Sequence, residues 1–147
     1  MSTNYKVMNC TPEAVFRVLA DGWLYPSWVV GASRIRNVGE GWPGEGAVIH
    51  HSFGTWPVLI DDTTSVDEWD PPRHAKFRAR GWPIGEAYVI IDVKPRGEAT
   101  CIVRIIEDAA EGPGRYVPKI LRDVGIYYRN IETLRRLAYL AEGDAGA

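Results

Sequence analysis

A long amphipathic segment near the C-terminus constrains the fold more than any other feature of this sequence. Between residues 118 and 141, apolar side chains recur at alternating spacings of four and three. This pattern predicts one helix about 36 Å long with a continuous apolar stripe. The stripe consists of Ile120, Val124, Tyr127, Ile131, Leu134 and Ala138. A single helix cannot bury such a stripe alone, so another element of the chain has to cover it.

The middle of the chain supplies that element as six strand-like segments. They are joined by short turns rich in glycine and proline, which favour antiparallel neighbours. The segments span 34–38, 47–53, 58–69, 75–80, 87–94 and 100–107. Before them, a strand over 5–10 leads into a helix over 12–20 capped by Thr11, and a short aromatic helix follows over 23–30. The order predicts an α+β fold in which a strongly curved antiparallel sheet of about seven strands surrounds the long helix.

Composition narrows the class of protein. We expect 147 residues with a net charge of −2 to form one domain with a frayed tail at 143–147, and not to bind nucleic acid. No segment approaches the roughly 20 apolar residues of a membrane span, and the N-terminus has no secretory run, so we expect a cytoplasmic protein. Cys10 and Cys101 lie far apart and the histidines lack ligand spacing, so we expect neither a metal nor a cofactor.

Several local motifs point to a family. They lie at the start of the first helix (11–16), after the second (28–31), at the end of a strand (67–72), before the last strand (97–100) and late in the long helix (129–137). With this element order, they resemble the START-like, or SRPBCC, superfamily, of the polyketide cyclase/dehydrase type. The resemblance covers about residues 5–141, although Glu98 and Ala99 stand where family members often have Asp or Gly. It implies a Bet v 1-like helix-grip fold whose cavity, between the sheet and the long helix, holds a hydrophobic small molecule.

Alternation along the strands predicts which side chains face that cavity. We expect a tight turn over 54–57 that pairs Phe53 with Val58, and a last hairpin that pairs Val93 with Thr100. With these registers, the apolar wall of the cavity consists of Ile49, Phe53, Ile60, Phe77, Val89, Ile91 and Ile102, joined by Val124, Tyr127 and Tyr128 of the helix. The two tyrosines either pack in the core or aim a hydroxyl at the ligand.

Three ionisable residues, His51, Asp62 and Arg104, share the inward register. Burying such groups is costly unless they are paired or solvated, so they mark a polar network or a wet cavity. His51 is either a hydrogen-bonded wall residue or a general base. Asp62 lies diagonal to His51, within reach of it unless a bulge turns Asp62 outward. Arg104 either binds a ligand oxygen or extends its charged head to the rim.

Tryptophan and arginine residues mark the predicted surface. The Trp residues outside the strands are Trp23, Trp28, Trp42, Trp56 and Trp82. In a helix-grip fold these connections frame the cavity mouth, so we expect Trp23 and Trp28 to contact a ligand there, with loop anchoring as the alternative. Arginines at 115, 122, 129 and 136 recur every seven residues and predict a solvated outer face of the long helix.

These predictions favour a protein that binds or carries a hydrophobic or aromatic molecule, lipid- or polyketide-like, because an apolar cavity with a few polar groups suffices. The alternative is a cyclase or dehydratase in which His51 moves protons, Asp62 orients it and Arg104 or Tyr128 stabilises an oxyanion. A third hypothesis is an interaction module that uses the Trp-rich rim. The expected partner is a small-molecule ligand, with a weak homodimer as an option, and the sequence leaves open whether the protein is an enzyme.

Overall fold

The chain forms a strand, two short helices, six more strands and a long helix, in the order that the sequence predicts. The structure is a computed structural model that describes residues 2–55, 58–81, 85–111 and 118–145. The elements are β1 (Ser2–Met8), α1 (Pro12–Ala20), the 3-10 turn η1 (Gly22–Leu24), α2 (Tyr25–Trp28), β2 (Ala32–Val38), β3 (Val48–Thr55), β4 (Val58–Asp70), β5 (His74–Gly81), β6 (Gly85–Pro95), β7 (Cys101–Glu111) and α3 (Lys119–Ala145).

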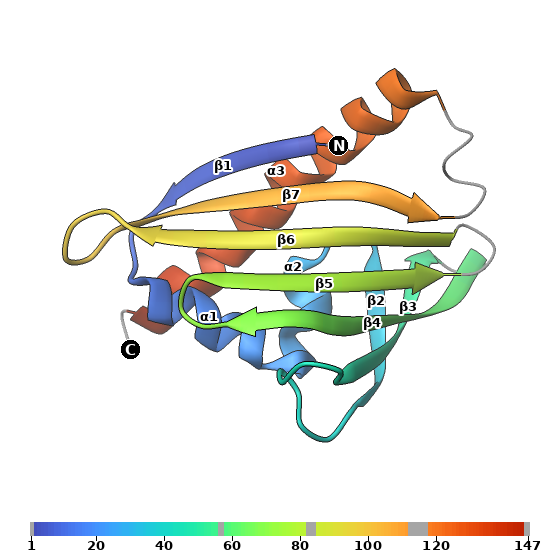
Figure 1. Cartoon of the computed structure of the whole chain (residues 1–147), viewed down its shortest axis with the longest axis horizontal. Coiled ribbons are helices and arrows are strands. Elements are labelled where there is room, and N and C mark those ends of the chain that lie inside the picture. Colours follow the sequence, from blue (N-terminus) through green and yellow to red (C-terminus); the bar gives the residue numbers. More distant parts are fainter. Residues whose placement is uncertain (1, 56–57, 82–84, 112–117, 146–147) are drawn as a thin grey trace.

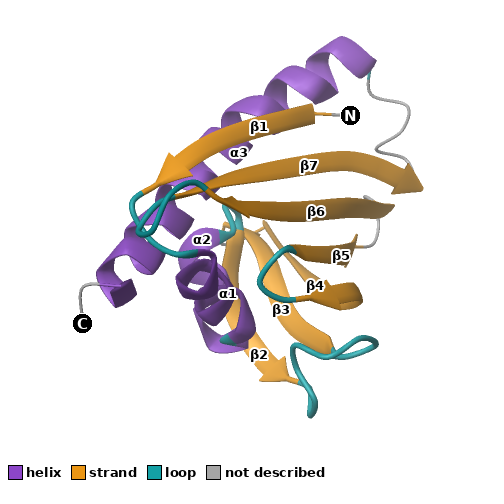
Figure 2. Ribbon diagram, turned by 60° about the vertical axis from the view of Figure 1, so that its left-hand side comes forward, coloured by secondary structure: helices purple, strands orange, loops and turns teal. Residues whose placement is uncertain are grey.

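The seven strands form one antiparallel sheet in the order β1-β7-β6-β5-β4-β3-β2, so that β1 and β2 are its edges (Figure 1). Figure 2 shows the sheet curling around α1, α2 and α3, which lie on its concave side. The predicted curved sheet around a C-terminal helix is therefore confirmed. Of the described helices, none is long and apolar enough to cross a membrane.

The core lies where α1 and the C-terminal half of α3 meet the sheet. The hydroxyl of Thr11 accepts a hydrogen bond from the Ala14 amide, and Pro12 begins the helix, so α1 starts and ends as predicted. The buried apolar residues of the two helices are Ala14, Val15, Phe16, Val18, Leu19, Leu134, Leu137, Ala138 and Ala141. They pack against the concave face of the sheet and fix α3 across β1 and α1.

The N-terminal half of α3 differs from the prediction. Ile120 is 79% exposed, and the stripe residues Val124, Tyr127 and Ile131 are also exposed instead of facing the sheet. In Figures 1 and 2 the first turns of α3 extend beyond β1, the edge strand, and the helix then crosses the sheet, where Asn4 Nδ2 of β1 donates to the Tyr127 carbonyl at 3.3 Å. The end of the helix was also predicted wrongly, since α3 continues through Gly143 to Ala145.

The hairpin between β3 and β4 is shifted by two residues relative to the prediction. Thr55 pairs with Val58, and Phe53 pairs with Ile60. A shift of two residues keeps every side chain on its predicted face. It also places His51 directly opposite Asp62 instead of diagonal to it.

The hairpin between β6 and β7 is shifted by three residues, and this shift reverses the faces of β7. Val93 pairs with Val103 instead of Thr100, because residues 96–100 form a longer loop closed by a 2.7 Å hydrogen bond from the Arg96 amide to the Thr100 carbonyl. An odd shift moves each side chain to the other face of the sheet. The prediction that Ile102 and Arg104 face the cavity was therefore wrong, and the buried residues are Cys101, Val103, Ile105 and Glu107.

Arg104 belongs instead to a row of charged side chains on the outer face. Its guanidinium donates to Asp92 Oδ2 at 2.5 Å, while Asp92 Oδ1 lies 2.6 Å from His74 Nδ1. The other ring nitrogen of His74 lies 2.5 Å from Glu68 Oε2. The hydrogen bonds to Asp92 and then Glu68 raise the pKa of His74, so the folded protein favours the imidazolium.

We expect this row to make stability depend on pH. Because the pKa of His74 is raised above 6.5 in the folded state, its contribution is complete below about pH 6.5 and is lost as pH rises through the folded pKa. Urea unfolding of the wild type and His74→Gln should therefore show a larger difference in free energy near pH 6 than near pH 9. A difference that is the same at both pH values contradicts the assignment.

Candidate functional site

Three buried polar side chains form a chain of hydrogen bonds on the concave face. The hydroxyl of Tyr25, at the start of α2, lies 2.8 Å from Thr64 Oγ1, which lies 2.9 Å from His51 Nε2. The rings of Tyr25 and His51 also pack together, with centroids 4.9 Å apart. His51 and Thr64 face inward because each occupies a strand position whose side chain points to the concave face. Tyr25 contacts them from α2.

The second ring nitrogen of His51, Nδ1, lies at the end of this series of hydrogen bonds and decides what the site can do chemically. His51 is 1% exposed, and its Nδ1 forms no well-aligned hydrogen bond within the described residues. If Thr64 donates to Nε2, then Nδ1 carries the proton and can donate it to a ligand oxygen. If Nε2 donates to Thr64, then Nδ1 presents a lone pair and can act as a base. The same chain of hydrogen bonds therefore supports either binding or proton transfer.

Burial sets the protonation of this cluster. It lowers the pKa of His51 to about 4, and the Ser52 backbone offsets only part of that change, so the imidazole is neutral at pH 7. Burial raises the pKa of Tyr25 to about 12 and that of Asp62 to about 6. Asp62 Oδ1 accepts a 2.6 Å hydrogen bond from the Thr63 amide, which only partly compensates.

A buried ion pair connects α3 to the same face of the sheet. The Arg129 guanidinium donates to Glu107 of β7, whose side chain is almost fully buried. Next to it on the helix, Asn130 is buried, and its Nδ2 has no partner within the described residues. Arg129 therefore faces inward, in contrast to the solvated face that the spacing of the arginines predicts.

The predicted site residues lie in several different places. Ile49, Phe77 and Ile91 are buried on the concave face, and Val89 packs against that core. The side chains of Phe53 and Ile60, and residues Trp56 and Trp82, lie outside the described residues. Three helix residues that were predicted to line the cavity, Val124, Tyr127 and Tyr128, are exposed, and their contact with a ligand stays a prediction.

The two predicted mouth tryptophans separate. Trp28 is buried and packs edge-on against Tyr25, with ring centroids 5.4 Å apart, so it belongs to the core. Trp23, in η1, is 63% exposed. Ligand contact by Trp23 and Trp28 stays a prediction.

Four polar residues of this face were not among the predicted site residues: Tyr25 and Thr64 of the hydrogen-bond series, and Glu107 and Arg129 of the ion pair. Thr64 and Glu107 were detectable in principle, since each follows the inward parity of its strand once the register is known. No local pattern identifies Tyr25 or Arg129, because their partners lie far away in the sequence. Within the described residues, no group of three or more His, Cys, Asp or Glu side chains is placed to hold a metal ion.

The raised pKa of Asp62 predicts that its charge destabilises the fold. The unfolded carboxyl ionises near pH 3.8 and the folded one near pH 6, so stability is lost as pH rises between these values. Asp62→Asn keeps the oxygen that accepts from Thr63 and removes the charge. We expect this variant to be more stable than the wild type in urea near pH 8, with the difference vanishing near pH 4. A variant less stable at both pH values contradicts this prediction.

A search of curated proteins finds no match. A conserved protein from Geobacillus kaustophilus is structurally similar, with a TM-score of 0.76 and 15% identity over 96% of this chain and 94% of that one. Ara h 8.0201 has a TM-score of 0.70 and 10% identity over 96% of both chains. These likenesses confirm the helix-grip fold.

A third similar structure is the di-domain ARO/CYC StfQ from the steffimycin biosynthetic pathway. Its TM-score is 0.74 at 12% identity, and the match covers 99% of this chain and 51% of StfQ. At the level of sequence, the family model for polyketide cyclase/dehydrase and lipid transport matches residues 3–138. The chain therefore belongs to the polyketide cyclase/dehydrase and lipid transport family.

Proposed function

We propose that this protein binds a hydrophobic small molecule that carries at least one oxygen, between the concave face of the sheet and α3. The observation that carries the proposal is the unpaired Nδ1 of His51 at the end of the buried Tyr25–Thr64–His51 chain. A buried polar atom without a partner costs about 1–3 kcal/mol, and native proteins rarely leave one unexplained. A ligand oxygen at Nδ1 removes that cost.

The surroundings of His51 support an apolar ligand with a polar end. Ile49, Phe77 and Ile91 supply apolar surface on the same face of the sheet. The ion pair of Arg129 with Glu107 and the unpaired amide of Asn130 supply further polar groups from the side of α3. Ligand sites commonly combine mostly apolar walls with a few oriented polar groups. The description of the family, which includes lipid transport, agrees with such a ligand.

A pair of probes that differ by one hydroxyl tests this proposal. We expect the wild type to bind 1-naphthol more tightly than naphthalene, as measured by fluorescence titration. His51→Phe keeps an aromatic ring against Tyr25 but removes both nitrogens. This variant should lose roughly fivefold or more of its affinity for 1-naphthol and keep its affinity for naphthalene.

His50→Phe is the matched control, because His50 is adjacent on β3 and has the opposite parity. It should bind both probes as the wild type does. If His51→Phe and His50→Phe weaken 1-naphthol binding equally, or if the wild type binds neither probe, the proposal is wrong. Circular dichroism of each variant verifies that it is folded.

A second candidate function is supported by the pairing of a neutral His51 with Asp62 directly opposite on β4. In the form with the proton on Nε2, Nδ1 can accept a proton from a methylene between two carbonyl groups. The resulting enolate carbon attacks a second carbonyl carbon of the same molecule, and the new alkoxide regains a proton from the imidazolium. Loss of water then completes a cyclisation of the kind catalysed by polyketide cyclases.

This second candidate predicts turnover that depends on the imidazole. A linear poly-β-ketone thioester incubated with the wild type should give a cyclic product by mass spectrometry, and His51→Phe should lower the rate by roughly 100-fold or more. His50→Phe should retain the wild-type rate. Because the pKa of His51 is about 4, the rate should not fall as pH is lowered from about 8 to 6 through protonation of this base. An inactive wild type, or equal rates for wild type and His51→Phe, excludes this candidate for that substrate.

A further inference from the structure

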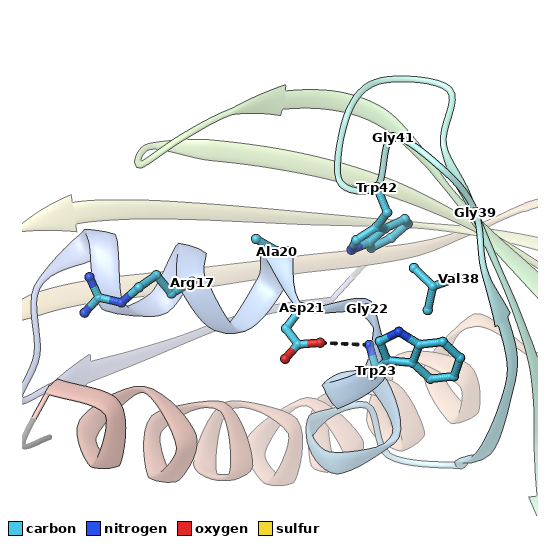
Figure 3. Close-up of a pocket in the computed structure, with 9 residues that line it drawn as sticks. All are labelled: Arg17, Ala20, Asp21, Gly22, Trp23, Val38, Gly39, Gly41 and Trp42. Atoms are coloured by element: carbon cyan, nitrogen blue, oxygen red, sulfur yellow. Dashed lines mark hydrogen bonds between the residues drawn. The ribbon is translucent and has the colours of Figure 1, made fainter.

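A separate pocket of about 400 Å³ lies at the C-terminal end of α1, outside the polar cluster of the concave face. It is formed by η1, the end of β2 and the connection that follows β2. Figure 3 shows the indoles of Trp42 and Trp23 at two levels with Val38 between them, and the Asp21 carboxylate to one side. Its volume is within the range of small-molecule sites.

The indole of Trp42 is held rigidly. Its Nε1–H donates to the Leu19 carbonyl at 3.3 Å, and its ring stacks on Phe77 with centroids 5.9 Å apart and planes inclined by 19°. One face of the indole therefore packs on the core. The opposite face is left for the pocket that Trp42 lines.

Trp23 supplies the second indole. The residue is 63% exposed. Its backbone is nevertheless fixed, because the Trp23 amide donates to Asp21 Oδ1 at 3.1 Å. An exposed indole on an anchored turn is typical of a surface that contacts another molecule.

Two close approaches of the backbone shape the floor of the pocket. A Cβ at Gly22 would lie 2.8 Å from Val38 Cγ1, and one at Gly39 would lie 2.6 Å from the Val48 carbonyl oxygen. Glycine at position 22 lets η1 approach the Val38 side chain, and glycine at position 39 lets the chain after β2 approach the backbone of β3. These two approaches fix the backbone around the pocket.

The charge next to the indoles selects the kind of ligand. The Asp21 carboxylate accepts from the Trp23 amide, and Arg17, which also lines the pocket, points away from the indoles in Figure 3. A carboxylate attracts a cation, and the faces of indole rings attract it further through their quadrupole. An anion gains neither interaction.

We propose that Trp23, Trp42 and Asp21 form a second binding site, which takes a small organic cation of the trimethylammonium type. Quaternary ammonium groups suit such a site because they are weakly hydrated, apolar on the outside and positively charged. This site lies outside the proposed ligand site at His51, although Trp42 stacks on Phe77, which belongs to the apolar part of that site.

Choline and its neutral carbon isostere, 3,3-dimethylbutan-1-ol, test the proposal because they share a shape and differ in charge. We expect choline to shift the indole N–H resonances of Trp23 and Trp42 in two-dimensional NMR, saturably, and to leave those of the other tryptophans in place. The isostere should bind more weakly than choline by roughly tenfold or more. Trp23→Leu identifies the Trp23 resonance.

Two variants and one control make the test specific. Asp21→Asn keeps the oxygen that accepts from the Trp23 amide and removes the charge, and Trp23→Leu removes the exposed ring. Each should weaken choline binding roughly fivefold or more in calorimetry. Tyr139→Leu, which removes another highly exposed aromatic ring on α3, should have no effect. The proposal is wrong if the isostere binds as tightly as choline, or if no indole resonance shifts.

The trimethylammonium group occurs both in free metabolites and in lipid headgroups, and vesicles distinguish these sources. Retention on phosphatidylcholine but not phosphatidylglycerol vesicles, lost in Asp21→Asn, assigns a headgroup. Choline binding without such retention assigns a free cation. If the protein neither binds choline nor is retained on the vesicles, the proposed site is refuted. Because Asp21→Asn should leave 1-naphthol binding unchanged, failure here is distinct from failure of the proposed function.

Discussion

The pairing of the seven strands controls the polar interior, because in an antiparallel sheet each side chain's face follows from its register. The parity of β3 and β4 places His51, Asp62 and Thr64 on the concave face. That of β7 places Glu107 there and sends Arg104 to the outer face. A shift of one residue in either hairpin would exchange a buried acid or imidazole for a different side chain. The site thus depends on hairpin geometry before it depends on any single contact.

Two of the covering helices, α2 and α3, contact this face through a polar interaction as well as through apolar packing. Tyr25 connects α2 to β4 by a hydrogen bond, and Arg129 connects α3 to β7 by an ion pair. Buried polar groups are weak contributors to stability compared with apolar contacts, since desolvation offsets most of their attraction. Their concentration between sheet and helices, while the apolar core lies under α1 and the end of α3, is the physical basis for placing a ligand there.

The two proposed sites differ in how they obtain specificity. The concave face offers an imidazole, whose pKa burial lowers to about 4, and a phenol; both are neutral at pH 7 and suit the oxygen of an apolar molecule. The pocket at Trp23 and Trp42 lies at the surface and offers a carboxylate beside aromatic faces, which suits a cation. One short segment between α1 and α2 contributes Trp23 to one site and leads into Tyr25 of the other.

The local sequence determined the order of elements, the limits of α1 and the inward faces of β3 to β6, because caps, turns and alternation act over a few residues. The tertiary structure decided the rest. The length of the 96–100 loop set the parity of β7, and hence the places of Ile102, Arg104 and Glu107. The width of the sheet decided how much of the α3 stripe is buried, leaving Ile120 exposed. The contacts of Tyr25 with Thr64 and of Arg129 with Glu107 join residues distant in the chain, so no local pattern encodes them.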